Sequence, residues 1–213
     1  MEALTFTSSR GLKLAAHLWD TPGNAGVAMI HGFCNDKSSN GRFDRLGAAL
    51  QEAGITALAF DVSGCGASGD ADLSARTMIE DLETACAFLR SRGKERIGLF
   101  GNSLGGSICL KAGLAGITAI AASGAGTGTT AYDWSAFFSA EQMEELAQTG
   151  AITEAAESAW RRSVTIGAEM LADFTDPERA PALEAIACPV LLLYGGNEED
   201  GEEQTLLAGA RAN

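Results

Sequence analysis

The stretch Arg96–Gly106, written RIGLFGNSLGG, decides the fold that we expect for this chain. Residues 97–100 form an apolar run, which is typical of a strand buried on both faces of a parallel sheet. The motif Gly101-Asn102-Ser103-Leu104-Gly105 then has the form Gly-x-Ser-x-Gly, in which serine occupies a sharp turn from strand to helix. Side chains two positions away on either side would collide with such a turn, hence the two glycines. We predict that Ser103 is an exposed nucleophile; the alternative is a glycine-rich turn with an incidental serine.

Similar apolar runs recur along the chain and alternate with helical patterns. A β-hairpin is expected over residues 2–19, and apolar periodicity predicts several helices, one of them capped by Ser74. This alternation predicts an α/β domain with a mostly parallel central sheet and helices on both faces. The expected buried strands are 26–30, 55–60, 96–100, 117–123 and 189–194, and the expected helices cover 43–50, 78–89 and 105–114.

Residues 124–187, hereafter the cap segment, interrupt this alternation. We expect helices over roughly 134–148 and 153–171. A segment this long between two strands of one sheet favours an inserted helical cap within a single domain of residues 1–213. Extra helices that cover the core are the alternative.

Composition excludes several functional classes. The chain has 213 residues and a formal net charge of −13, which disfavours binding to nucleic acid or to anionic membranes. Its five cysteines show no paired spacing, which suits a reducing cytosol. Neither a secretory signal nor an apolar run of membrane-spanning length is visible. We therefore expect a cytoplasmic protein without nucleic-acid or membrane partners.

Two further loops belong beside Ser103 in this prediction. The run 26–30 ends in His31-Gly32-Phe33, and acyl transfer needs two backbone donors for the oxyanion. The N–H groups of Phe33 and Leu104 are our candidates, with His31 as a turn residue; an ordinary strand-ending turn is the alternative. Asp61 leaves the next strand into a glycine-rich loop, where bracing of the loop is favoured over a role as catalytic acid.

The segments HGFCNDKSS, FDVSGCGASG, GNSLGG and CPVLLLYGG make the chain resemble the α/β-hydrolase superfamily. The resemblance is to serine esterases and acyl hydrolases of the cinnamoyl-esterase and serine-aminopeptidase-like type. It implies Ser103 as nucleophile and Phe33 and Leu104 as oxyanion donors. It also implies an eight-stranded sheet with a helical lid after the sixth strand, and no metal or organic cofactor.

The resemblance also implies a catalytic acid after the seventh strand, which here ends LLLYGGNEEDG. Counting from Gly195 favours Glu198, where the family usually carries aspartate. Glu199 and Asp200 remain open. The alternative is a solvated acidic turn at the start of a helix.

The histidine that should activate Ser103 is missing from these motifs. The chain contains two histidines, His17 in the expected hairpin and His31 at the oxyanion turn. We expect His17 on the sheet surface. The family's histidine follows an eighth strand, so we expect roughly 25–40 residues beyond Asn213 to be missing, judged from typical element lengths. The strand 189–194 would then be an exposed edge, through which we hypothesise a homodimer.

These features predict a carboxylic-ester hydrolase that acts on a small-molecule ester and is impaired by the absent histidine. Trp134, Phe137 and Phe138 either line its acyl pocket or form the packing core of the cap. Acyl transfer, thioester cleavage or peptide cleavage on the same serine is one alternative. A non-catalytic binding or signalling protein on a hydrolase scaffold is the other.

Overall fold

A computed structural model describes residues 1–128, 133–176, 181, 183–196 and 201–212 of the chain. Its described residues contain a seven-stranded sheet in the order β1-β2-β4-β3-β5-β6-β9. β1 and β2 are antiparallel, as expected of a hairpin. The other five strands of this sheet, β4, β3, β5, β6 and β9, run parallel to one another. The strands are β1 (Glu2–Thr7), β2 (Lys13–Trp19), β3 (Ala25–Ile30), β4 (Thr56–Phe60), β5 (Arg96–Asn102), β6 (Ile117–Ser123) and β9 (Val190–Leu193).

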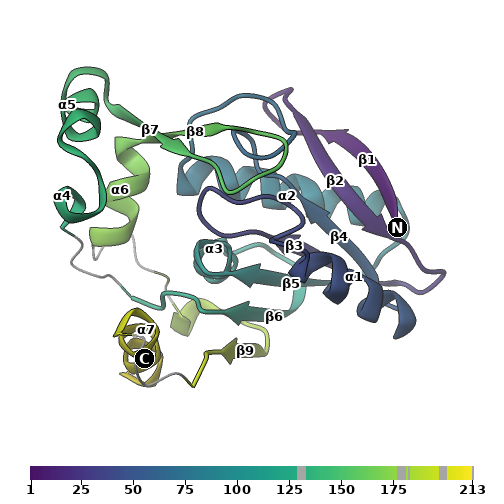
Figure 1. Cartoon of the computed structure of the whole chain (residues 1–213). Helices are drawn as coiled ribbons and strands as arrows, with labels where there is room; N and C mark the ends of the chain where they lie inside the picture. The colour runs from purple at the N-terminus through teal and green to yellow at the C-terminus, as the bar shows by residue number, and fades with distance from the viewer. Residues whose placement is uncertain (129–132, 177–180, 182, 197–200, 213) are drawn as a thin grey trace.

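Helices cover both faces of this sheet, so the predicted α/β architecture is confirmed (Figure 1). Ser74 caps α2 as predicted, because its hydroxyl accepts the N–H of Thr77 in a capping box. The helices outside the cap segment are α1 (Arg42–Glu52), α2 (Ala75–Ser91), α3 (Leu104–Lys111) and α7 (Gly201–Ala212).

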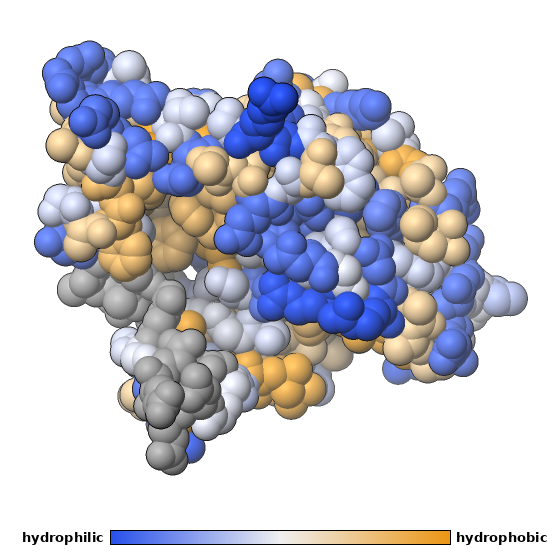
Figure 2. Space-filling view, viewed as in Figure 1, coloured by the Kyte–Doolittle hydropathy of each residue, from blue (hydrophilic) through white to orange (hydrophobic). Residues whose placement is uncertain are grey.

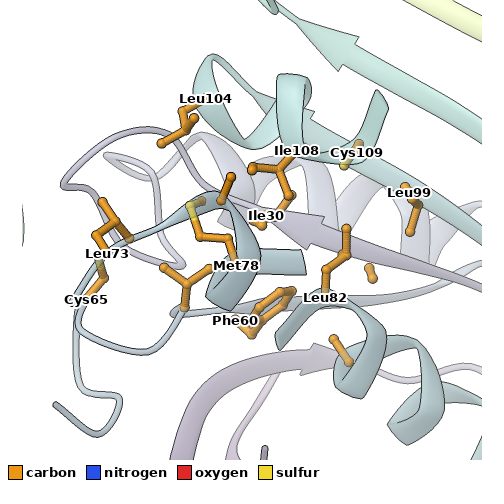
Figure 3. Close-up of a cluster of buried hydrophobic side chains, with 14 of the residues drawn as sticks. Ile30, Phe60, Cys65, Leu73, Met78, Leu82, Leu99, Leu104, Ile108 and Cys109 are labelled. Carbon is orange, nitrogen blue, oxygen red and sulfur yellow. The ribbon is translucent and has the colours of Figure 1, made fainter. Parts of the chain in front are cut away.

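Each face of the sheet has its own core. The larger core joins the sheet to α2 and α3, and Figure 3 shows Met78 and Leu82 of α2 facing Ile30 of β3 and Phe60 of β4. All four of these side chains are fully buried. The smaller core packs Phe43 of α1 against Trp19 and other residues on the opposite face. Since α3 begins directly after β5, the larger core fixes the position of the turn at Ser103.

The cap segment differs in part from its prediction. The helix expected over 134–148 is present as α4 (Trp134–Phe137) and α5 (Ala140–Thr149). The prediction of a second helix over 153–171 is wrong. β7 (Ala151–Ala155) and β8 (Ser163–Gly167) form an antiparallel pair there, and a helix begins only with α6 (Ala168–Thr175). A short 3-10 helix, η2 (Leu183–Ala185), precedes β9.

Pairing with the core explains the strands. β8 is rich in β-branched residues, and Val164 and Ile166 are both buried. The N–H of Leu73, in the loop after β4, donates to Thr165 O at 2.8 Å, and the N–H of Gly167 donates to Leu73 O. These long-range bonds favour an extended backbone in a segment where the local spacing of apolar residues predicted a helix.

β9 lies at the end of the strand order. Three of its four residues have exposed side chains, with Leu191 at 55% exposure. Among the described residues, the sheet therefore ends in an apolar edge strand. No described helix is both long and apolar enough to span a bilayer.

Candidate active site

Ser103 stands where β5 turns into α3, in a backbone conformation that few residues adopt. Its φ is 53° and its ψ is −122°, and the residue is exposed. Its N–H donates to Ser123 O at 2.7 Å, and its carbonyl accepts the N–H groups of Gly106 and Ser107. These bonds hold the strained turn in place and leave the side chain accessible.

The glycines of the motif are required by close backbone approach. A Cβ on Gly101 would overlap the carbonyl group of Gly105. A Cβ on Gly105 would lie 2.3 Å from Ile30 O and 2.5 Å from His31 O. The turn is therefore pressed against the end of β3, which brings the residues after Ile30 beside Ser103.

The loop after β3 supplies the second half of the arrangement. A Cβ on Gly32 would lie 3.4 Å from Ser103 Cβ, so this loop lies beside the serine. Phe33 and Leu104 line the same cavity as Ser103. Within the part of the chain that the structure describes, neither of their N–H groups donates to a protein acceptor.

A cavity of about 450 Å³ opens above Ser103, between the core and the cap segment. Figure 2 shows the hollow on the left of the molecule, with hydrophobic surface along its rim. Ser103 and Ser107 lie on its wall, and α4, β7, α6 and α7 also contribute residues to the described lining. Since β5 and β6 both point toward the cap segment in Figure 1, the cavity lies at the carboxyl edge of the sheet.

Aromatic side chains form one continuous wall of this cavity. Phe33 contacts Phe174 of α6 edge-to-face, with 6.1 Å between ring centroids. Phe174 in turn contacts Trp134 of α4 at 5.6 Å. Trp134 also contacts Phe137 and Phe138, which line the cavity as well. The wall thus runs from the loop after β3 into the cap segment.

Charged groups also line the cavity. Lys111 of α3 forms an ion pair with Asp173 of α6, with 3.2 Å between Nζ and Oδ1. Glu154 and Glu157 line the cavity from β7 and from the loop that follows it. Burial, with a smaller contribution from the charges of the two glutamates, raises the pKa of the Cys34 thiol to about 12. Cys34 is therefore a protonated thiol at neutral pH.

Neither histidine is available to activate Ser103. His31 is fully buried; its Nδ1 lies 2.8 Å from Gly32 O, and its Nε2 accepts the N–H of Val62 at 3.2 Å. Burial lowers the pKa of His31, so the ring is neutral with its proton on Nδ1. This agrees with the predicted turn role. His17 Nδ1 lies 3.0 Å from Asp44 Oδ1. The prediction that His17 lies on the sheet surface is wrong, because its side chain is buried.

Asp61 braces the loop after β4, as predicted. Its carboxylate accepts the N–H groups of Lys37 and Ala67 at 2.6 and 2.8 Å, and pairs with Lys37 Nζ at 2.9 Å. A Cβ on Gly66 would overlap this carboxylate. Asp61 therefore joins two loops and does not line the described cavity.

The predicted acid lies outside the described residues, as do both alternatives: Glu198, Glu199 and Asp200. The structure thus brings together Ser103, Phe33 and Leu104. Among the residues it describes, no group of three or more His, Cys, Asp or Glu side chains is arranged to hold a metal ion.

Sequence reasoning missed the charged residues of the cavity. One signal for Lys111 was present, because Ser103, Ser107 and Lys111 are spaced by four residues along the predicted helix. Asp173, Glu154 and Glu157 carried no such signal, since their segment was assigned to the wrong secondary structure.

Comparison with known proteins places the fold. The sequence profile of the alpha/beta hydrolase family matches residues 27–212. A hypothetical protein from Pseudomonas aeruginosa is 19% identical with a TM-score of 0.70, over 99% of this chain and 81% of its own. An esterase from Pyrococcus furiosus is 17% identical with a TM-score of 0.67, over 99% and 77%. An alpha/beta hydrolase from a Penicillium species is 17% identical with a TM-score of 0.63, over 99% and 96%. No protein with a curated description matches the chain. At these identities the structural likeness is one of fold.

Proposed function

The chain belongs to the alpha/beta hydrolase family, and on that premise we propose that it is a carboxylic-ester hydrolase with Ser103 as nucleophile. One observation carries this proposal. Ser103 is exposed in a strained turn and lines a cavity together with Phe33 and Leu104. Both neighbours contribute a backbone N–H without a described protein acceptor. This arrangement suits an oxyanion hole.

In the proposed reaction Ser103 Oγ bonds to the carbonyl carbon of the ester. Negative charge develops on the carbonyl oxygen, where the N–H groups of Phe33 and Leu104 stabilise it. The bond to the alcohol oxygen then breaks, and the alcohol leaves with the proton that Ser103 Oγ has lost. Water attacks the acyl-serine and releases the carboxylic acid, which restores the hydroxyl of Ser103.

Neither described histidine, His17 or His31, is placed to receive the proton of the Ser103 hydroxyl. His31 uses both ring nitrogens in other hydrogen bonds, and His17 pairs with Asp44. We therefore propose that this chain is an impaired esterase. An oxyanion hole and substrate binding alone retain an acceleration of roughly 10³–10⁴-fold over water. We propose Glu198 as the acid.

The cap segment is proposed to be the lid of this site. Trp134 and Phe174 reach from the cap segment to Phe33 in one aromatic wall. An acyl or aryl group of an ester packs favourably on such a surface.

Hydrolysis of p-nitrophenyl butyrate tests the proposal. The chain should give slow turnover above the buffer rate, and Ser103→Ala should abolish it. Ser9→Ala removes an exposed serine that does not line the cavity and should leave the rate unchanged. Turnover that survives Ser103→Ala contradicts the proposal.

The hydrogen bonds of His31 also favour a second reading, a binding protein that has kept a hydrolase scaffold. Such a protein would bind small molecules in the cavity without acylation of Ser103. Covalent labelling of the serine separates the two functions.

We also propose that the exposed edge of β9 pairs with a second copy of the chain. Leu191 and Leu193 are 55% and 44% exposed on this outer strand. An apolar edge strand is a template for pairing with another strand.

A further inference from the structure

Two carboxylates of the cap segment face the same cavity as the nucleophilic serine. Glu154 accepts hydrogen bonds from the Gln142 side chain and from the N–H of Ala155. Glu157 accepts one from the Asn35 side chain at 3.1 Å. These partners are neutral, so they orient the carboxylates without cancelling their charge.

Lys111 is the positively charged side chain among the described lining residues, and it already forms an ion pair. Lys111 is held by Asp173, whose second carboxylate oxygen accepts the N–H of Ala75 at 3.3 Å. Among the described lining residues, three carboxylates therefore face one ammonium group. An anionic ligand would meet repulsion in such a cavity, whereas a cationic one would be attracted.

The negative potential reaches the wall beside Ser103. Cys34 lies in the loop after β3, and its carbonyl accepts the N–H of Glu157 at 2.9 Å. Burial is the main reason that the pKa of Cys34 is raised, and Glu154 and Glu157 are the charges that add to the shift. Both glutamates thus act electrostatically on a group that lines the cavity.

The aromatic wall offers the second feature that a cation needs. Trp134 and Phe174 line the cavity, and aromatic rings of this kind attract alkylammonium groups through their faces. Carboxylates and aromatic rings that enclose one cavity are complementary to an amine with an apolar body.

From this arrangement we infer that the cavity selects ligands that carry a positively charged amine, with Glu154 and Glu157 as the specificity-determining residues. The inference rests on the proposed function in one respect, since it takes the selected ligand to be the substrate of Ser103. The substrate class is then an ester whose acyl or alcohol part bears an amino group.

Calorimetric titration with benzylamine, benzyl alcohol and benzoate at neutral pH tests this inference. The three ligands share a benzene ring and differ in charge. Benzylamine should bind about tenfold more tightly than benzyl alcohol, and benzoate more weakly than either. In the double variant Glu154→Gln/Glu157→Gln the preference should fall below about threefold, because glutamine removes the charges while each side chain keeps its length and one acceptor oxygen. Glu144→Gln, on the exposed face of α5, should leave the preference unchanged.

Equal binding of the three ligands, tighter binding of benzoate, or no saturable binding of benzylamine overturns the inference. So does a preference that survives the double variant, whose fold is checked by circular dichroism. The titration is repeated on Ser103→Ala and needs no catalysis. An amine preference without any reactivity of Ser103 contradicts the proposed function alone, and a reactive Ser103 without the preference contradicts this inference alone.

Discussion

A Cβ atom on Gly101 would lie 2.2 Å from the carbonyl oxygen of Gly105. These two glycines flank Ser103, and their backbones touch across the turn that exposes it. The steric requirement of the Gly-x-Ser-x-Gly motif is thus a contact between its own first and last residues.

The first prediction concerns this contact. Gly101→Ala should lower the free energy of unfolding by about 2 kcal/mol or more, because a backbone carbonyl has to move. It should also remove any reactivity of Ser103. Chemical denaturation measures the first effect. Gly98→Ala in the same strand is the matched control, since its nearest neighbours would lie 3.5 and 3.6 Å away. Equal stability of the two variants would contradict the steric argument.

The buried ion pair between Lys37 and Asp61 gives the second prediction. The side chains are 5% and 0% exposed, so Asp61→Asn leaves a buried ammonium without its carboxylate counter-charge. We expect a loss of about 3 kcal/mol in denaturation experiments. Asp70→Asn breaks the pair between Arg161 and the 90% exposed Asp70 and should cost less than about 1 kcal/mol. A similar cost for both variants would show that the loop does not depend on Asp61.

The strands and the position of Ser103 followed from the sequence because they are local. Buried parallel strands appear in the sequence as apolar runs such as 96–100. The two glycines that flank Ser103 indicate a sharp turn from strand to helix. The strands at 151–167 did not follow, because their pairing with Leu73 is visible only in three dimensions. The same distant contacts determine which cap residues line the cavity.

His31 shows a second limit. Its position after the strand predicted a turn residue, and the structure adds complete burial and two hydrogen bonds. The burial of His17 against Asp44 was missed, because an alternating hairpin does not reveal which face a later helix covers.

The third prediction follows from the lowered pKa of His31. The unfolded chain binds a proton on this residue at higher pH than the folded chain. Stability from the neutral ring is therefore present above about pH 6.5 and is lost as the pH falls toward the folded pKa. The loss amounts to at most about 1.4 kcal/mol per pH unit, and His31→Gln should remove it.

Imidazole resonances in NMR spectra measure the same property directly. The two histidines give a simple spectrum, in which His31 should remain the neutral Nδ1–H tautomer to lower pH than an ordinary histidine does. A folded protein whose His31 titrates near pH 6.5 would contradict the assignment.

The fourth prediction concerns the edge strand β9. If two copies pair through this edge, Leu191→Lys should shift the protein toward the monomer in sedimentation velocity, because lysine disfavours edge-to-edge pairing. Met1→Lys is the control, since Met1 is another exposed apolar side chain, at 65% exposure. A parent chain that stays monomeric at high concentration rules out the dimer.

Labelling with a fluorophosphonate probe, read by peptide mass spectrometry, tests the central claim that Ser103 is a nucleophile most directly. The account predicts a slow but complete adduct on Ser103, which is lost in Ser103→Ala and on unfolding, and is retained in Ser107→Ala. An unmodified Ser103 in the folded chain, or an adduct that forms equally on Ser107, would contradict it.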